Sequence, residues 1–288
     1  MALRPKTLSA AVVPVWVASA LVVTQGLSPK LWVSVLATMS SIFIQIGTNF
    51  VNDALDFKKG ADTSTRLGPK RVTQSGLLSA RQVITGAALC FVVAALLGLP
   101  LVIEGGWPII AIGITSILMG YAYTGGPYPL AYRGLGDLFV ILFFGLVAVG
   151  GTYFLHTGTY HSDAFVAGLQ VGFLATVLIA VNNLRDAPED AKVKKRTLAV
   201  RFGISFARFE ILSLVLLAFA LGIHWELREQ RWAALMPLVA LPLATKIVRD
   251  VYRHAPSPIY NQFLAKSGAL HLLFGILISI GFLLGSVA

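Results

Sequence analysis

The chain has 288 residues, of which 56% are hydrophobic and only 12% are charged. A soluble domain contains about 25% charged residues, so this composition excludes an ordinary water-soluble fold. The single cysteine, Cys90, excludes a disulfide framework and a thiolate metal site, and the net charge of +10 follows loop topology rather than a nucleic-acid surface.

Apolar runs of about 20 residues, each long enough to cross a bilayer, recur along the chain. We expect nine transmembrane helices, at roughly 8–24, 31–52, 81–103, 107–124, 137–155, 164–183, 207–225, 232–250 and 268–287. They use most of the sequence, which predicts an all-α, polytopic membrane protein with one domain over residues 1–288. Ser79, with Gln82 three residues later, predicts a capping box at the start of the third helix.

The basic residues are concentrated in alternate loops. Of the 23 Lys and Arg residues, all except Lys30, Arg228 and Arg231 fall on the side that contains the N-terminus. The positive-inside rule places that side in the cytoplasm and the C-terminus outside. No organelle transit sequence is evident, so we expect a bacterial inner membrane, with a thylakoid as the alternative.

The second span ends in a polar stripe. Its members are Gln45, Asn49, Asn52 and Asp56, whose helical spacing places them on one face. Such a face cannot contact lipid and must line the interior of a bundle. Asp53 and Asp62 add two carboxylates, and the following loop is basic, with Arg66, Lys70 and Arg71.

The sixth span ends in a similar pattern. Asn182, Asp186 and Asp190 are spaced by four residues and share one face if the helix continues, although Pro188 either ends or bends it. The loop that follows is again basic, with Lys192, Lys194, Lys195, Arg196 and Arg201.

Both acidic clusters lie at the cytoplasmic, C-terminal end of a helix, where the helix dipole disfavours carboxylates. A divalent cation between them removes the repulsion, and oxygen ligands suit Mg²⁺, which also binds phosphates. Lys and Arg from the adjoining loops then pair with the remaining phosphate oxygens. The pattern predicts a site for a metal-bound diphosphate; the alternative is a set of surface ion pairs.

Several segments carry a family resemblance. They are Arg4-Pro5-Lys6-Thr7-Leu8, Asn52-Asp53-x-x-Asp56-x-x-x-Gly60-x-Asp62, Arg66-x-Gly68-Pro69-x-Arg71, Gly134-x-Gly136-Asp137, Asn182-Asn183-x-Arg185-Asp186-x-x-x-Asp190 and Lys195-x-Thr197-Leu198-Ala199-Val200. The chain resembles the UbiA superfamily of intramembrane prenyltransferases. The likeness is greatest to the branch that prenylates 1,4-dihydroxy-2-naphthoate on the route to menaquinone or phylloquinone.

The resemblance implies nine helices around a central cavity and a Mg²⁺-diphosphate site. The implied metal ligands are Asp56, Asp62, Asp186 and Asp190, and the implied catalytic residues are Asp53, Asp56, Asp186 and Lys195. The implied substrate-binding residues are Asn52, Arg66, Lys70, Arg71, Asn182, Arg185, Arg196, Tyr121, Tyr123 and Asp137. Two positions depart from the wider family: Gly60 stands where Asp is common, and Lys194 stands where a glycine is usual before the lysine.

The implied reaction ionises a polyprenyl or phytyl diphosphate, and an aromatic acceptor captures the allylic cation, with CO₂ lost in the naphthoate branch. The tyrosines near the mouth, Tyr121, Tyr123, Tyr128 and Tyr132, either shield the cation or form an interfacial belt. Asp137 is either a helix N-cap or a polar group of the site.

Two alternatives remain open at this level. The first is a prenyltransferase of the same superfamily that acts on 4-hydroxybenzoate, homogentisate or chlorophyllide. The second is a membrane transporter, which is expected to have ionisable residues at mid-bilayer rather than at one membrane face.

Overall fold

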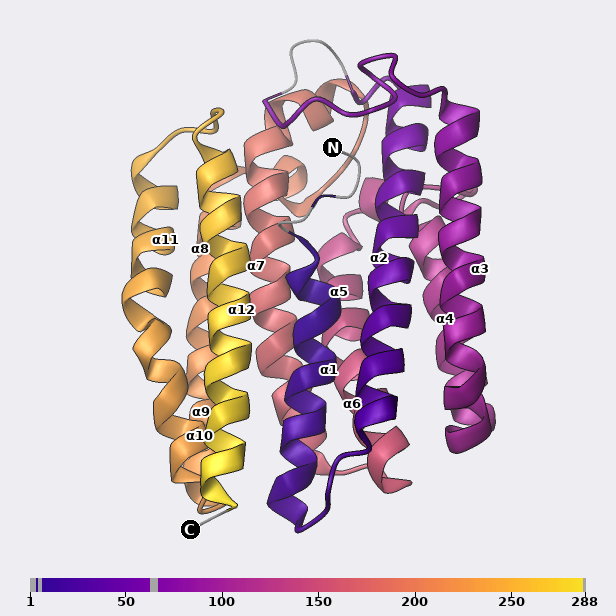
Figure 1. Ribbon diagram of the computed structural model, residues 1–288. Helices are drawn as coiled ribbons and strands as arrows, with labels where there is room; N and C mark the ends of the chain where they lie inside the picture. Colours follow the sequence, from indigo (N-terminus) through magenta and orange to yellow (C-terminus); the bar gives the residue numbers. More distant parts are fainter. Residues whose placement is uncertain (1–3, 5–6, 63–66, 287–288) are drawn as a thin grey trace.

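The computed structural model describes residues 4, 7–62 and 67–286, and this part of the chain is helical and contains no strand. The helices run side by side in one bundle, and the two termini lie at opposite ends of it (Figure 1). The helices and the short 3-10 and π-helical segments between them are α1 (Ser9–Leu21), η2 (Val22–Gln25), α2 (Leu31–Lys58), α3 (Ala80–Gly105), α4 (Trp107–Ala122), η3 (Leu130–Arg133), α5 (Gly136–Val140), η4 (Ile141–Val147), α6 (Ala148–Thr157), α7 (Ser162–Lys192), α8 (Leu198–Ala220), α9 (Gly222–Leu227), α10 (Arg231–Leu235), η5 (Met236–Ala240), α11 (Leu241–Arg253) and α12 (Tyr260–Gly285).

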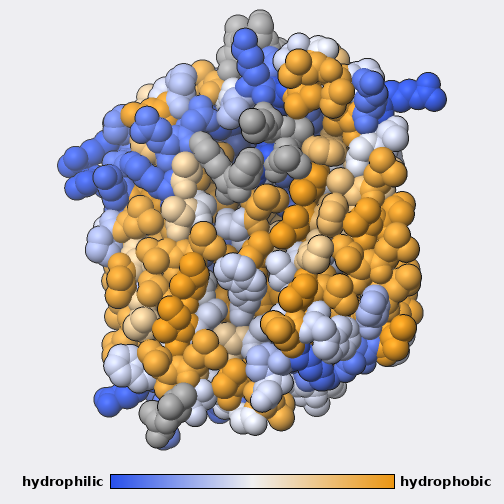
Figure 2. All heavy atoms as spheres, viewed as in Figure 1, coloured by the Kyte–Doolittle hydropathy of each residue, from blue (hydrophilic) through white to orange (hydrophobic). Residues whose placement is uncertain are grey.

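Seven helical units within the described residues are long and apolar enough to cross a membrane: α2, α3, α5–η4–α6, α7, α8–α9, α10–η5–α11 and α12. Two further apolar units, α1–η2 and α4, are shorter. Hydrophobic residues form a band around the middle of the visible face, and hydrophilic residues gather at its two ends (Figure 2). The all-α, polytopic architecture is confirmed, whereas the count of nine spans stays a prediction.

Several helices continue past the apolar runs that predict them. Helix α2 extends to Lys58 and α7 to Lys192, so Asp53, Asp56, Asp186 and Asp190 lie on helix, whereas Asp62 follows the end of α2. Pro188 does not end α7. Helix α8 begins at Leu198 but is interrupted at Gly203, whose φ of 84° is a left-handed conformation that favours glycine. The predicted capping box is confirmed, because Ser79 and Gln82 each accept a backbone hydrogen bond from the other.

Helix α7 occupies the middle of the bundle and is the most buried of the seven spans, with 72% of its apolar window inside the protein. It contacts α8 and α12 on one side and η4 on the other. The contact with η4 depends on glycines, since a Cβ atom added to Gly145 would lie 2.4 Å from the carbonyl oxygen of Gly168. Small residues at such crossings allow close backbone packing in a membrane.

Replacing Gly145 by alanine is therefore expected to destabilise the protein by about 1–3 kcal/mol, the range for overpacking a tight interior. Thermal unfolding of the purified variant in detergent measures the change. Gly150→Ala is the matched control, because a Cβ at Gly150 meets no atom within 4 Å. Equal melting temperatures for the two variants would contradict this account of the α7–η4 contact.

Candidate active site

The polar stripe at the end of α2 is buried in the bundle. Asn49 is 2% exposed and Asp56 is 4% exposed, and Gln45 and Asn52 are buried as well. This placement confirms that the stripe faces the interior of the protein. The same helical face passes from Gln45, within the apolar part of the bundle, to Asp56 at its polar end.

The loop after α2 folds back onto the helix end through Arg71. The Arg71 guanidinium lies 2.8 Å from Asp56 and 3.1 Å from Asp62, and it donates a hydrogen bond to the backbone oxygen of Asn52 at 2.7 Å. Burial lowers the pKa of Arg71, but the adjacent carboxylates outweigh it and raise the pKa above its ordinary value. Arg71 therefore stays charged and compensates two buried carboxylates.

Asp53 holds the same loop from its other side. Its carboxylate accepts hydrogen bonds from the backbone N–H groups of Val72 and Thr73, at 3.2 and 3.1 Å. Its side chain does not line either cavity described below. The geometry thus gives Asp53 contacts that position the backbone next to Arg71, while its catalytic role stays a prediction.

At the end of α7, Arg185 forms a buried fork. Its Nε and Nη2 atoms each donate to Asp186 at 2.7 Å, and it also donates to Asn182 at 2.8 Å and to Asn261 of α12 at 2.7 Å. Asp190 lies one helical turn after Asp186, and it pairs with Lys195 of the following loop at 3.2 Å. Each acidic position at the end of α7 therefore has a basic partner from the same stretch of chain.

The two helix ends meet at Tyr132, in the short segment η3. Its hydroxyl donates to Asp56 at 2.9 Å, while Lys59 and Lys195 lie 4.4 and 5.9 Å from its ring centroid. Burial, and then the negative charges of Asp56 and Asp190, raise the pKa of Tyr132, so its phenol remains a proton donor. Tyr132 thus links the acidic end of α2 to the basic loop after α7.

Between these helix ends lies a polar cavity of about 40 Å³. Asn52 and Asp56 of α2 line it together with Asn182 and Asn183 of α7, which are four predicted spans away in sequence. Asp62, Asp186 and Asp190 do not line it. Its polar lining residues are Arg4, Asn52, Asp56, Arg71, Tyr123, Thr124, Asp137, Asn182, Asn183, Lys195 and Thr197.

The carboxylates at the two helix ends do not by themselves form a metal site. No group of three or more His, Cys, Asp or Glu side chains is arranged to hold a metal ion within the described residues. The reason is visible in the ion pairs, since Asp56 and Asp62 face Arg71, Asp186 faces Arg185 and Asp190 faces Lys195. The donor chemistry still fits a hard cation, because the wall offers the carboxylates of Asp56 and Asp137 and several amide oxygens. Outside that wall, Asp190 Oδ2 has no hydrogen-bond partner among the described residues.

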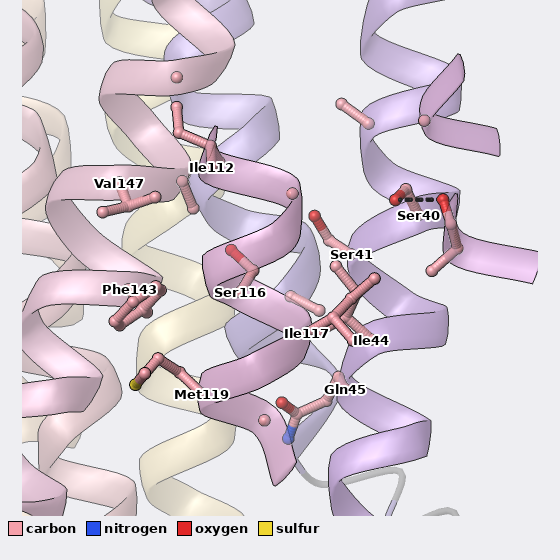
Figure 3. Close-up of a pocket in the computed structure, with 18 of the residues that line it drawn as sticks. Ser40, Ser41, Ile44, Gln45, Ile112, Ser116, Ile117, Met119, Phe143 and Val147 are labelled. Carbon is pink, nitrogen blue, oxygen red and sulfur yellow. Dashed lines mark hydrogen bonds between the residues drawn. The ribbon is translucent and has the colours of Figure 1, made fainter. Parts of the chain in front are cut away.

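A second cavity, of about 520 Å³, extends from the polar one into the apolar part of the bundle. Its lining residues lie between Ala10 and Leu155, in the segments from α1 to α6. No described residue of α7 to α12 lines it. Most of its wall is aliphatic or aromatic, and Figure 3 shows Ser41, Gln45 and Ser116 among Ile117, Met119 and Phe143. Tyr123 lines both cavities and therefore stands at their junction.

The structure separates the remaining predicted residues into two groups. Asn182 and Asp137 line the polar cavity, and Asp137 is 5% exposed. In contrast, the side chains of Lys70, Tyr121 and Arg196 are exposed and line neither cavity. Arg66 lies outside the described residues. The N-cap reading of Asp137 is wrong, because α5 has Leu135 at its N-cap position and no side-chain cap.

Sequence reasoning missed three residues that support the site. Thr124 donates a hydrogen bond to the side chain of Asn52, and Lys59 donates to the backbone oxygen of Thr124. Asn261 holds Arg185 from α12 and also donates to the backbone oxygen of Leu67. Lys59 was visible as part of the basic loop, whereas Asn261 carries no local signal because its role depends on how α12 packs.

The loops around Tyr132 and after α7 are joined to each other. The backbone N–H of Arg196 donates to the carbonyl oxygen of Tyr132 at 3.1 Å, and Arg201 donates to the carbonyl oxygen of Arg133 at 2.9 Å. Gly134 fits closely between them, since a Cβ there would lie 2.8 Å from the carbonyl oxygen of Arg196. These contacts hold Tyr132 in place beside Asp56, which lines the polar cavity.

Residues 11–270 match the model of the UbiA prenyltransferase family. The chain is 35% identical to a 1,4-dihydroxy-2-naphthoate octaprenyltransferase of Haemophilus influenzae, over 98% of this chain and 94% of that protein. A solved UbiA homologue from Aeropyrum pernix has a TM-score of 0.71 at 15% identity, covering 96% of this chain and 97% of that one. A UbiA homologue from Archaeoglobus fulgidus bound to DMAPP and Mg²⁺ has a TM-score of 0.61 at 17% identity, covering 96% and 98%.

Replacing Arg71 by alanine is expected to lower the stability of the protein, because Asp56 and Asp62 lose their buried partner. Removing one member of a buried ion pair costs about 3–5 kcal/mol. Thermal unfolding in detergent measures the loss, and Lys70→Ala provides the control, since the side chain of Lys70 is exposed. If Arg71→Ala unfolds at the temperature of Lys70→Ala, Arg71 does not stabilise the end of α2.

Proposed function

The chain belongs to the UbiA prenyltransferase family, and we propose that it transfers a polyprenyl group from its diphosphate to 1,4-dihydroxy-2-naphthoate, releasing CO₂ and diphosphate. The relative from H. influenzae, similar over nearly the whole chain, supports this acceptor and places the reaction in menaquinone biosynthesis. The observation that carries the proposal is the junction of the two cavities at Tyr123. It provides a polar chamber for a charged head group beside an apolar one for a long tail.

The polar cavity binds the diphosphate in this proposal. Arg71 and Lys195 line it and present their charged groups close to Asp56 and Asp190. When the diphosphate binds, these cations turn from the carboxylates to the phosphate oxygens and stabilise the negative charge of the leaving group. Mg²⁺, held by Asp56, Asp62, Asp186 and Asp190 with help from Asn52, would supply further charge neutralisation at the diphosphate.

The supporting residues keep this arrangement in place. Asp53 fixes the backbone next to Arg71, and Arg185 holds Asp186 and Asn182 in one orientation. Arg66, Lys70 and Arg196 belong to the basic loops on either side, where they attract the anionic donor through long-range electrostatics.

The apolar cavity holds the prenyl tail and keeps water from the reacting carbon. Its wall includes Tyr123 and also Phe139 and Phe143, whose rings stack with a centroid separation of 5.6 Å. Aromatic faces stabilise positive charge, so these rings and Tyr123 shield the allylic cation as it forms. Exclusion of water prevents hydrolysis of that cation before the acceptor ring attacks it.

The protein is an integral membrane protein, and the polar cavity lies at the end of the bundle that holds the N-terminus and the basic loops. We place this end in the cytoplasm of a bacterium and the C-terminus outside, because of the distribution of Lys and Arg. We propose a single transmembrane prenyltransferase domain over residues 1–288.

The first prediction concerns the product. Purified protein in detergent, given Mg²⁺, a polyprenyl diphosphate and 1,4-dihydroxy-2-naphthoate, is expected to form a prenylated naphthoquinol that lacks the carboxyl group. Mass spectrometry of the product identifies both substrates, and a panel with phytyl diphosphate, 4-hydroxybenzoate, homogentisate and chlorophyllide tests the other donor and acceptors.

Two outcomes of that assay would contradict the proposal. A transporter catalyses no turnover in detergent, so the absence of any prenylated product across the panel would favour transport. Turnover that persists after EDTA treatment, with no loss relative to the untreated enzyme, would remove the divalent cation from the mechanism.

The second prediction concerns the acidic helix ends. Asp56→Ala and Asp186→Ala are each expected to reduce turnover by about 100-fold or more, the usual effect of removing a preorganised electrostatic contact. Steady-state turnover with the donor and acceptor above measures the effect. Glu226→Gln removes a carboxylate that is half exposed and paired with Arg231 at the other end of the bundle, and it serves as control. Full turnover in a folded Asp56→Ala or Asp186→Ala variant would contradict these roles.

A further inference from the structure

Asp137 differs from the other carboxylates around the polar cavity. It is 5% exposed and lines the cavity, yet its Oδ1 atom has no hydrogen-bond partner among the described residues. Asp56, the other carboxylate in that wall, pairs with Arg71 and accepts the hydroxyl of Tyr132. Asp137 therefore has an unused acceptor atom at a site where a substrate binds.

The position of Asp137 is the junction of the two cavities. Gly136, the preceding residue, abuts the hydroxyl of Tyr123, because a Cβ added there would lie 2.8 Å from that oxygen. Asp137 lines the polar cavity together with Tyr123, which lines both cavities. The carboxylate thus lies beside the point where a prenyl diphosphate passes from its polar head to its apolar tail.

Asp137 stands in the first turn of α5, where backbone N–H groups that have no partner within the helix stabilise negative charge.

The acceptor needs a base at this point. In 1,4-dihydroxy-2-naphthoate one hydroxyl is adjacent to the carbon that bears the carboxylate, and electron donation from that hydroxyl drives attack by the ring carbon. A group that holds the hydroxyl proton during the attack lowers the barrier, typically by a factor of about 10²–10⁴ in rate.

We propose that Asp137 takes the proton of this hydroxyl as the ring is alkylated and returns it after CO₂ leaves. The inference rests on the proposed acceptor. The ring carbon bonds to the allylic carbon, whose bond to the diphosphate oxygen breaks and leaves its electron pair on the diphosphate. The O–H electron pair becomes a carbonyl bond, and the proton moves to Oδ1 of Asp137.

The second half restores the starting protonation state. The bond between the ring and the carboxylate breaks, CO₂ departs, and the electron pair forms an enolate that regains aromaticity. The enolate oxygen takes the proton back from Asp137. The cycle consumes no proton and requires no further reactant, so the base needs no exchange with solvent and can lie deep in the protein.

The test is turnover of Asp137→Asn with two acceptors, 1,4-dihydroxy-2-naphthoate and its analogue with a methoxy group in place of the hydroxyl next to the carboxylate. With the natural acceptor, kcat is expected to fall about 100-fold or more, while KM for the prenyl diphosphate stays close to the wild-type value. With the analogue, which has no proton to give, wild type and variant are expected to turn over at the same low rate. An equal loss with both acceptors would overturn the proposal.

Two further measurements separate this role from a structural one. Slow release of diphosphate by hydrolysis, without acceptor, is expected to fall much less in Asp137→Asn than prenylation of the naphthoate does, and an equal loss in both reactions would mean that Asp137 acts on the donor. Asp137→Glu, which keeps a carboxylate, is expected to retain more activity than the asparagine variant, and activity no higher than that of the asparagine variant would overturn the proposal. Glu104→Gln, a carboxylate removed from the far end of α3, is the control.

Turnover by the wild-type protein distinguishes a failure of the proposed function from a failure of the proposed role of Asp137. If wild type does not prenylate the naphthoate, the proposed function fails. If wild type does so and Asp137→Asn equals it, only the role of Asp137 fails.

Discussion

The arrangement of this bundle depends on compensating carboxylates that are buried at helix C-termini. Burial of an unpaired carboxylate costs several kcal/mol, and the helix dipole adds to the penalty. The chain meets this constraint with Arg71 at the end of α2 and with Arg185 and Lys195 at the end of α7. Because Arg71 and Lys195 come from the loops that follow α2 and α7, those loops must fold over the helix ends. The mouth of the site is therefore shaped by charge pairing rather than by apolar packing.

The same pairing explains how one set of residues serves both stability and binding. Arg71 and Lys195 neutralise carboxylates in the protein alone, and in the proposed complex they face a diphosphate instead. The carboxylates are then compensated by the metal ion that accompanies the diphosphate. Exchange of one set of counter-charges for another keeps the number of uncompensated buried charges low, so binding does not pay a large desolvation penalty.

Much of the fold and half of the site could be predicted from sequence, for physical reasons that differ from residue to residue. Apolar runs show which segments pack in lipid, and the spacing of Asn49, Asn52 and Asp56 shows which face turns inward. Spacing also brings Asn182 and Asp186 onto one face. The extension of α7 through Pro188 could not be predicted, because the exposed position of that proline depends on the surrounding helices.

Contacts between distant segments were beyond the reach of local patterns. Asn261 contacts Arg185 only because α12 packs against α7, and no periodic pattern in the sequence predicts that contact. The sequence does not distinguish Tyr132 from the three other tyrosines near the mouth. The structure does, because η3 positions its hydroxyl to donate to Asp56. The cavity lined by α1–α6 likewise depends on how α7 separates the two halves of the bundle, a property of tertiary packing alone.

Tyr123 has a consequence for how such enzymes diversify. Tyr123 lines both the polar and the apolar chamber, so in the proposed complex the reactive carbon of any donor is held in register from the head-group side. Additional isoprene units extend only toward Leu101, Ile109 and Leu155 at the far end of the apolar chamber. Related enzymes can therefore accept quinone tails of different length through changes in a few aliphatic side chains there, while the charged residues around the polar cavity stay the same.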